Sequence, residues 1–258
     1  MKKLTGFMRE FLSALRSGFG FLTTIPVGIT MEGIEKLMKH AYLFPLIGAV
    51  LGVILGIMAY IFSIIFPQAV IPFAIIIVIY YLTGFNHIDG LADFGDGIAA
   101  HGTREKKIAA MRDTAVGTGG LIFCIIAILG IFASLFSIAK SNMLPYALIV
   151  AETGAKQSMV TVAAFGRKLH EGFGAMTVEN TRFSDFIIGM VFTGIVSYFF
   201  LGVFGVEAFI ISQLAALLVL NTANRHFGGV SGDIIGASNE VGRLAALLFI
   251  GGFAWMQL

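Results

Sequence analysis

Long apolar stretches, separated by links that are either very short or polar, dominate this chain. Seven stretches have roughly the 17 to 25 residues that a helix needs to cross a bilayer, at 41–66, 68–85, 116–139, 143–165, 183–205, 206–222 and 242–258. Buried helices of soluble proteins rarely run so long without interruption. The pattern predicts an all-α, polytopic integral membrane protein with about seven transmembrane helices, formed as a single membrane domain by residues 1–258.

A different apolar pattern precedes the first of these spans. Apolar residues recur there with i, i+3, i+4 spacing, at Leu4, Phe7, Met8, Phe11, Leu12 and Leu15. Arg9, Glu10 and Arg16 interrupt the region, which excludes the apolar core of a secretory signal. We predict an amphipathic helix lying in the membrane interface. The alternative is a helix packed against the others, as in a soluble protein.

The links between the predicted spans indicate on which side of the membrane the charged residues lie. Links 66–68, 139–143 and 205–206 are very short, whereas links 86–115, 166–182 and 223–241 are long and polar. Alternating spans place the N-terminus and all three long links on one side, together with nearly all Lys and Arg residues. Lys140 lies on the opposite side. The positive-inside rule predicts that the long links and the N-terminus face the cytoplasm.

Composition supports a membrane protein and excludes several functions. Hydrophobic residues make up 57% of the chain and charged residues only 12%, against about 25% charged in soluble domains. The net charge of +2 gives no long-range field for nucleic acid. The single cysteine, Cys124, excludes an intrachain disulfide and a zinc-binding cysteine cluster. Gly48, Gly52 and Gly56 recur every four residues, which predicts close packing between helix backbones.

Aspartates in the first long link form the main candidate site. Asp89, Asp93 and Asp96 fall at i, i+4 and i+7, which places them on one helix face with Asn86, while His87 falls nearly opposite. Such carboxylates repel one another unless a cation lies among them. Oxygen ligands of this kind suit Mg²⁺ or Mn²⁺, so we predict a metal site, with a solvated acidic helix end as the alternative. Three glycines in this stretch favour an early end to the helix.

Further candidates lie outside this trio. Asp113 follows a basic stretch and adds a fourth carboxylate if the link folds back. In the segment 221–240, Asp233 and Glu240 are candidate ligands and Arg225 a candidate phosphate contact, with a flexible turn as the alternative.

Two charged residues, Glu152 and Lys156, lie inside a predicted span at i, i+4 spacing. A carboxylate and an ammonium group at this spacing can neutralise each other on a helix. The pair is either a paired charge facing the bundle interior or a contact with substrate.

Five segments together carry a resemblance to a known family. HIDGLADFGDG at 87–97 resembles the signature of the cobalamin synthase family, whose activity is that of an adenosylcobinamide-GDP ribazoletransferase. In the same order, FLTTIPV at 21–27, FPLIG at 44–48, Glu105 with MRD at 111–113, and GGVSGDIIGASNE at 228–240 are similar to further family motifs. Thr24 replaces a common Arg, Thr114 a Ser, and Ser231 a Thr. The matches span nearly the whole chain.

The resemblance implies a Mg²⁺-dependent enzyme of the prokaryotic plasma membrane. It would join adenosylcobinamide-GDP to α-ribazole, or its 5′-phosphate, with release of GMP. The implied partners are these small molecules and the lipid bilayer, with a homo-oligomer or a complex with other corrinoid-pathway enzymes as a further expectation. We assign catalysis to His87, Asp89, Asp93 and Asp96, metal binding to Asp89, Asp93, Asp96, Asp113 and Asp233, and substrate binding to Asn86, Arg112, Arg225, Ser231 and Glu240.

Two rival functions remain. A CDP-alcohol phosphotransferase also uses an Asp-rich motif that begins D-G-x-x-A, which residues 89–92 echo only in part. An ion-coupled transporter could line its path with Glu152 and Lys156. Against the transporter, the polar residues gather on one predicted side of the membrane, and the sequence shows no inverted repeat.

Overall fold

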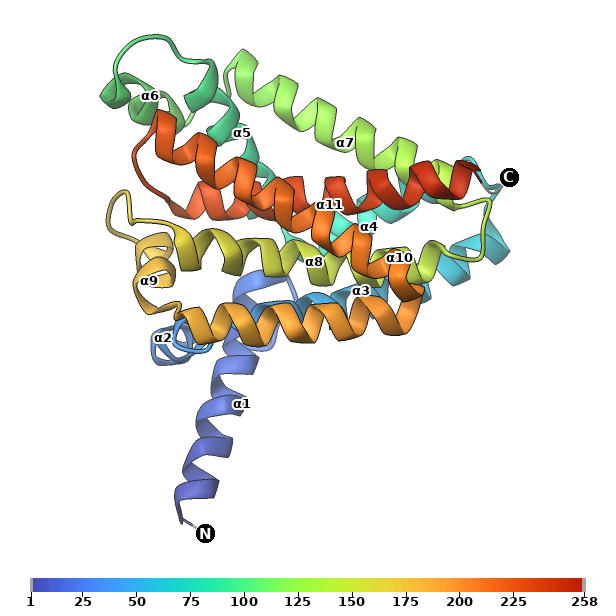
Figure 1. Ribbon diagram of the computed structural model, residues 1–258, viewed down its shortest axis with the longest axis horizontal. Helices are drawn as coiled ribbons and strands as arrows, with labels where there is room; N and C mark the ends of the chain where they lie inside the picture. Colours follow the sequence, from blue (N-terminus) through green and yellow to red (C-terminus); the bar gives the residue numbers. More distant parts are fainter. Residues whose placement is uncertain (1, 257–258) are drawn as a thin grey trace.

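The computed structural model describes residues 2–256, and side chains from residue 8 onward. Within this range the chain forms helices and no strand, which confirms the all-α prediction. The helices are α1 (Lys2–Leu22), α2 (Met31–Met38), α3 (Leu43–Ile65), α4 (Ile71–Thr83), α5 (Asn86–Ala99), α6 (Arg104–Met111), α7 (Thr118–Ile138), α8 (Leu144–Phe165), α9 (Phe173–Asn180), α10 (Phe183–His226) and α11 (Gly232–Met256). Figure 1 shows the long helices lying side by side in one bundle.

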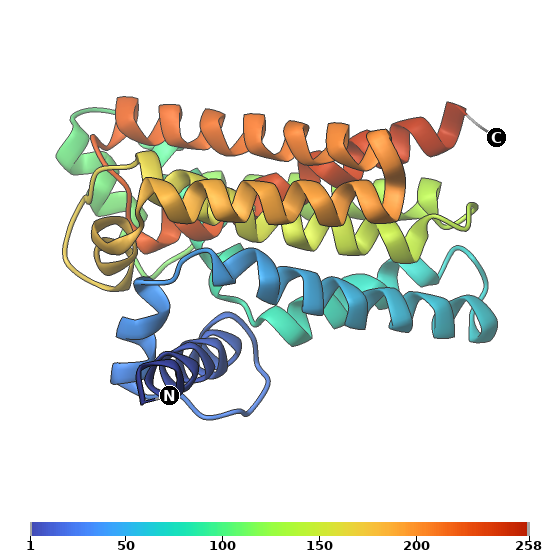
Figure 2. The ribbon, with the colours of Figure 1, turned by 60° about the horizontal axis from the view of Figure 1, so that its bottom comes forward.

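The N-terminal helix α1 stands apart from this bundle. It projects across the direction of the long helices in Figure 1 and is seen nearly end-on in Figure 2. Met8 and Leu12 are more than half exposed, whereas Phe11 and Leu15 pack against the core. Leu4 and Phe7, also part of the predicted apolar stripe, lie outside the described side chains. This placement favours the interfacial helix over one packed along the others.

Fewer helices than predicted pass a test of length and hydropathy for crossing a membrane. Within residues 2–256, α3, α7, α10 and α11 pass, and the pair α4–α5, bent by 95°, can count as a fifth span. The predicted count of seven is therefore not confirmed. The 44-residue α10 folds back at Gly202, near the predicted link at 205–206, where φ is 63°. α4 has only 13 residues, too few to span a bilayer alone.

The outer surface of the bundle is apolar, as contact with lipid requires. Ile64, Leu129 and Phe199 are exposed by 71%, 60% and 79%. Charged Glu152, meanwhile, is completely buried. A soluble protein would not expose apolar side chains so widely, so the arrangement is that of a multi-pass membrane protein.

The two ends of the bundle differ in structure. Figure 2 shows α2, α6, α9 and the connection 227–231 at one end, and the turns 66–70 and 139–143 at the other. The polar links predicted from the sequence therefore share one end of the molecule, and this end carries the candidate site.

Two predictions about these links are wrong in detail. The link expected at 223–241 is mostly helical, because α10 continues to His226 and α11 begins at Gly232. The early end expected for the helix that begins at Asn86 does not occur, and α5 continues to Ala99. Its glycines lie at close contacts with neighbouring elements, where the absence of a side chain offsets their low helix propensity.

The glycine repeat of α3 packs against α8, as predicted. A Cβ atom added at Gly48 would lie 2.5 Å from the carbonyl oxygen of Glu152, and one at Gly52 would lie 2.5 Å from the Cα of Ile149. A Cβ at Gly56 would lie 3.0 Å from the carbonyl oxygen of Pro145. Only glycine allows this approach of the two backbones.

We therefore expect Gly52→Ala to lower the unfolding temperature of the purified protein in detergent, because overpacking of this kind costs about 1–3 kcal/mol. Gly194→Ala is the matched control, since a Cβ at Gly194 meets no atom within 4 Å. Its unfolding temperature should equal or slightly exceed that of the wild type. Equal unfolding temperatures for the two variants would contradict the close packing of α3 on α8.

Candidate active site

Helices α5 and α11 cross at two glycines, and this crossing assembles the site. A Cβ atom at Gly90 would lie 2.6 Å from the carbonyl oxygen of Asp233. One at Gly236 would lie 3.3 Å from the Cα of His87. The start of α11 can therefore approach the aspartates of α5 closely.

An acidic cavity lies at this crossing. It has a volume of about 410 Å³, and its polar lining consists of Asp89, Asp93, Asp113, Asp233, Arg112, Thr114 and His170. The structure thus brings together four of the five predicted metal ligands and Arg112, one of the predicted substrate-binding residues. Nothing in the sequence singled out His170, which lies in a short basic loop without a distinctive motif.

The donor chemistry of the acidic cavity fits a magnesium ion held together with phosphate groups. Four carboxylates share the space with Arg112, so they repel one another unless further positive charge is present. Among the described residues, no three His, Cys, Asp or Glu side chains form a ready set of metal ligands. Mg²⁺ usually binds through one or two carboxylates, several waters and substrate phosphates, so it does not require such a set.

The loop 166–172 contributes His170 to the lining of the acidic cavity. Its backbone pairs with the connection between α10 and α11: Leu169 N–H donates to the Val230 carbonyl at 2.9 Å, and Val230 N–H donates to the Arg167 carbonyl at 2.7 Å. Lys168 forms ion pairs with Glu171 and Glu179, whose hydrogen bonds raise the pKa of this lysine. These contacts hold His170 beside the cavity.

Two predicted site residues form hydrogen bonds to neighbouring protein groups. The carboxylate of Asp96 accepts hydrogen bonds from Gly117 N–H at 2.7 Å and Gly120 N–H at 2.8 Å, at the start of α7. Asp96 does not line the acidic cavity, so its catalytic and metal-binding roles stay predictions. Ser231 donates to Asp233 Oδ2 at 3.1 Å and precedes the first residue of α11. It therefore holds the Asp233 carboxylate in place.

Asn86 and His87 line a second cavity, which we call the aromatic cavity. Asp233 lines both cavities and stands between them. His87 is 6% exposed, while Asp89 is exposed. His87 and Asp89 thus line different cavities, whereas Asn86, predicted on the face of the aspartates, lines the cavity of His87.

Two further predicted substrate contacts, Arg225 and Glu240, lie away from both cavities. Arg225 is exposed near the end of α10. Glu240 is completely buried and forms an ion pair with Arg243. Substrate binding by these two residues stays a prediction.

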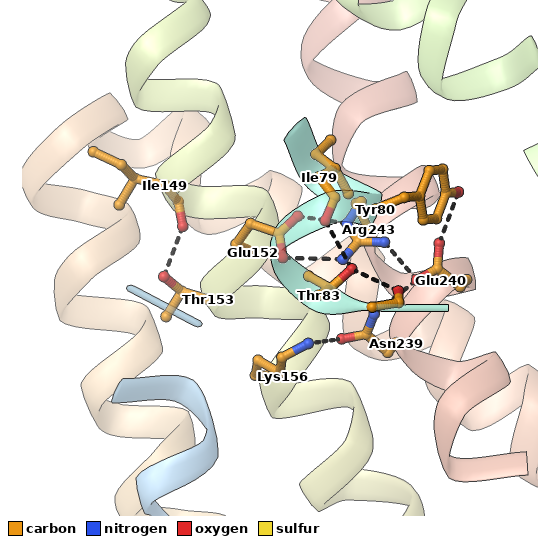
Figure 3. A network of polar contacts seen from close by, with 11 residues as sticks. Ile79, Tyr80, Thr83, Ile149, Glu152, Thr153, Lys156, Asn239, Glu240 and Arg243 are labelled. Carbon is orange, nitrogen blue, oxygen red and sulfur yellow. Dashed lines mark hydrogen bonds and ion pairs between the residues drawn. The ribbon is translucent and has the colours of Figure 1, made fainter. Parts of the chain in front are cut away.

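A buried network of charges surrounds Glu240 (Figure 3). Arg243 pairs with Glu152 of α8 as well as with Glu240, and Tyr80 of α4 donates to Glu240 at 3.3 Å. The ammonium group of Lys156 donates to Asn239 Oδ1 at 2.7 Å. Of the two alternatives for Glu152 and Lys156, both charges do face the bundle interior, but they do not pair with each other, because α11 brings a guanidinium group to Glu152 that forms two hydrogen bonds with it.

Comparison with known proteins decides the family. The sequence model of cobalamin-5-phosphate synthase matches residues 14–251. The chain belongs to this family. The resemblance seen in the five sequence segments is thereby confirmed.

Three similar proteins carry the same name, and each aligns with this chain over most of its length. The adenosylcobinamide-GDP ribazoletransferase of Methanosarcina barkeri is 42% identical, over 97% of this chain and 100% of its own length. That of Methanococcoides burtonii is 41% identical over 94% and 93%, and that of Clostridium tetani is 34% identical over 88% and 92%. No solved structure gives a significant match. These relatives favour cobalamin synthesis over the CDP-alcohol and transporter alternatives.

The different surroundings of Asp93 and Asp96 lead to opposite expectations for stability. Asp96→Asn should lower the unfolding temperature measured in detergent without added metal, because it removes a charge-assisted hydrogen bond worth about 1–3 kcal/mol. Asp93→Asn, the matched charge change on the same helix, should leave the unfolding temperature unchanged or raise it, since it relieves repulsion among the carboxylates. A larger loss for Asp93→Asn than for Asp96→Asn would contradict these placements.

Proposed function

We propose that the chain transfers the phosphorylated corrinoid of adenosylcobinamide-GDP to α-ribazole, or to its 5′-phosphate. A ribazole hydroxyl oxygen bonds to the phosphorus nearer the corrinoid. The bond from that phosphorus to the bridging oxygen breaks, and GMP leaves with this oxygen. The products are adenosylcobalamin, or its 5′-phosphate, and GMP.

The acidic cavity carries this proposal. Phosphoryl transfer depends chiefly on positioning and on neutralising the charge of the phosphate oxygens. Asp89, Asp93, Asp113 and Asp233 line this cavity and would hold Mg²⁺, and Arg112, which also lines it, would contact a phosphate oxygen. Bound Mg²⁺ supplies positive charge against the pyrophosphate.

The position of Asp233 suits it to a second task. Because it lines both cavities, its carboxylate can reach a hydroxyl group entering from the aromatic cavity. We assign the acceptance of the hydroxyl proton to this carboxylate. The hydrogen bond from Ser231 holds one of the two oxygens of this carboxylate.

Turnover of the detergent-purified protein tests the reaction. With adenosylcobinamide-GDP, α-ribazole and Mg²⁺, we expect release of GMP and formation of cobalamin, and we expect EDTA to abolish both. Asp93→Asn should lower kcat by on the order of 100-fold or more, as the removal of one electrostatic contact does in other enzymes. Glu207→Gln, an exposed acidic position remote from the acidic cavity, is the control.

Several outcomes would contradict the proposal. Absence of GMP release by protein that unfolds cooperatively would discard the reaction. Release of CMP from a CDP-alcohol would favour the rival phosphotransferase. Turnover that persists in EDTA, or a wild-type kcat in Asp93→Asn, would exclude the metal site in the acidic cavity.

We further propose that the end of the bundle with the acidic cavity faces the cytoplasm, as the positive-inside rule predicts. Lys106 is exposed on α6 at this end, and Lys140 is exposed in the turn 139–143 at the opposite end. Association with a second copy, or with other corrinoid-pathway enzymes, stays a prediction.

Labelling of single cysteines tests the orientation. After Cys124→Ala, we expect Lys106→Cys to react with a membrane-impermeant maleimide only in permeabilised spheroplasts. Lys140→Cys should react in intact spheroplasts. The reverse pattern of labelling would show that the acidic cavity faces outward.

A further inference from the structure

The aromatic cavity differs from the acidic cavity in size and in chemistry. Its volume is about 220 Å³, and its apolar lining includes Phe21, Phe44, Met159, Phe173 and Ile235. These residues come from the end of α1, the start of α3, α8, α9 and the start of α11. The rings of Phe21 and Phe173 lie edge to face, with centroids 5.5 Å apart. Such a cavity suits a flat aromatic group.

An unsatisfied polar atom marks the same cavity. His87 lines it and is 6% exposed, yet its Nδ1 atom has no hydrogen-bond partner. A buried polar group without a partner is costly, and native proteins seldom retain one without a reason. A ligand that offers one hydrogen-bonding atom among apolar surfaces would remove this cost.

The sizes and polarities of the substrate groups separate the candidates for this cavity. A corrin macrocycle is far larger than the cavity. Guanine carries several donors and acceptors on its edges, and most would lose their partners against phenylalanine and methionine side chains. The benzimidazole base of α-ribazole is flat and apolar, and its free imine nitrogen is a single hydrogen-bond acceptor.

The position of the aromatic cavity agrees with this choice. Asp233 joins it to the acidic cavity, so a nucleoside whose base lies in the aromatic cavity would direct its sugar towards the carboxylates. Asn86 and Thr177 also line the cavity and offer further polar groups to that sugar.

We propose that the aromatic cavity binds the base of the acceptor nucleoside, with the imine nitrogen accepting a hydrogen bond from His87. This assignment rests on the proposed function, because it names the subsite of one of its two substrates. It makes His87 a specificity-determining residue rather than the general base.

The first test compares Phe173→Ala with Phe165→Ala. The two phenylalanines are similarly exposed, by 44% and 46%, but Phe165 packs against Phe183 and Phe186 outside the cavity. Phe173→Ala should raise the KM for α-ribazole by on the order of 10-fold, the usual effect of losing an aromatic contact with a base. The KM for adenosylcobinamide-GDP should not change, and Phe165→Ala should leave both values unchanged.

The second test replaces His87 and changes the base. The wild-type enzyme should prefer α-ribazole to the analogue in which indole replaces benzimidazole, because indole lacks the imine acceptor. His87→Leu should lose this preference, because the KM for α-ribazole rises towards that of the indole analogue once the imine nitrogen has no donor. Equal loss of kcat for both nucleosides, with the preference intact, would return His87 to the role of general base and overturn the proposal.

A binding measurement separates this inference from the proposed function. Equilibrium dialysis of labelled α-ribazole, without donor or metal, should show binding to the wild type and weaker binding to Phe173→Ala. If the wild type turns over and Phe173→Ala has an unchanged KM for α-ribazole, the inference alone would be overturned. A raised KM of Phe173→Ala for adenosylcobinamide-GDP would also overturn the inference. If the wild type shows no turnover but binds α-ribazole, and Phe173→Ala weakens this binding, the proposed reaction would be overturned and the subsite retained.

Discussion

The positive charge of Arg243 must be neutralised inside an apolar bundle. This requirement links α11, which begins beside the acidic cavity, to the rest of the molecule. An unpaired charge is costly in such surroundings. Glu152 of α8 and Glu240 of α11 both pair with the guanidinium group, while Lys156 adds a second buried positive charge. Buried ion pairs of this kind add little net stability but can favour one packing arrangement over others. We infer that this network fixes the position of α11 against α8. It thereby also fixes the position of Asp233, which precedes Arg243 by ten residues on α11.

The same helix also separates the two cavities to which we assign the two substrates. Close contact at Gly90 and Gly236 brings the start of α11 against α5, so Asp233 faces the aspartates of α5 on one side and the aromatic cavity on the other. Charged pyrophosphate and a flat apolar base need opposite surroundings. A carboxylate between the two cavities is placed where the bond between the substrates would form.

Several features of the site could be read from the sequence, and others could not. The spacing predicted that Asp89 and Asp93 lie together and apart from His87, because a helix fixes the direction of each side chain relative to its neighbours in sequence. The two aspartates line the acidic cavity and His87 the aromatic cavity, although Asn86, predicted beside the aspartates, lies with His87. The same spacing placed Asp96 with the other aspartates. The start of α7 offers Asp96 two backbone N–H groups instead, and nothing in the local pattern announces that contact.

By itself the sequence determined that the protein is an all-α membrane protein, that its polar segments gather at one end, and that it resembles the cobalamin synthase family. Apolar length, helical spacing and motif order carry this information, because they depend only on residues close together in the chain. Tertiary structure alone decided that Glu152 pairs with Arg243 rather than Lys156, and that Asp233 stands between the two cavities. Both outcomes depend on which helices meet, since charges and cavities inside a bundle are completed by residues far apart in the sequence.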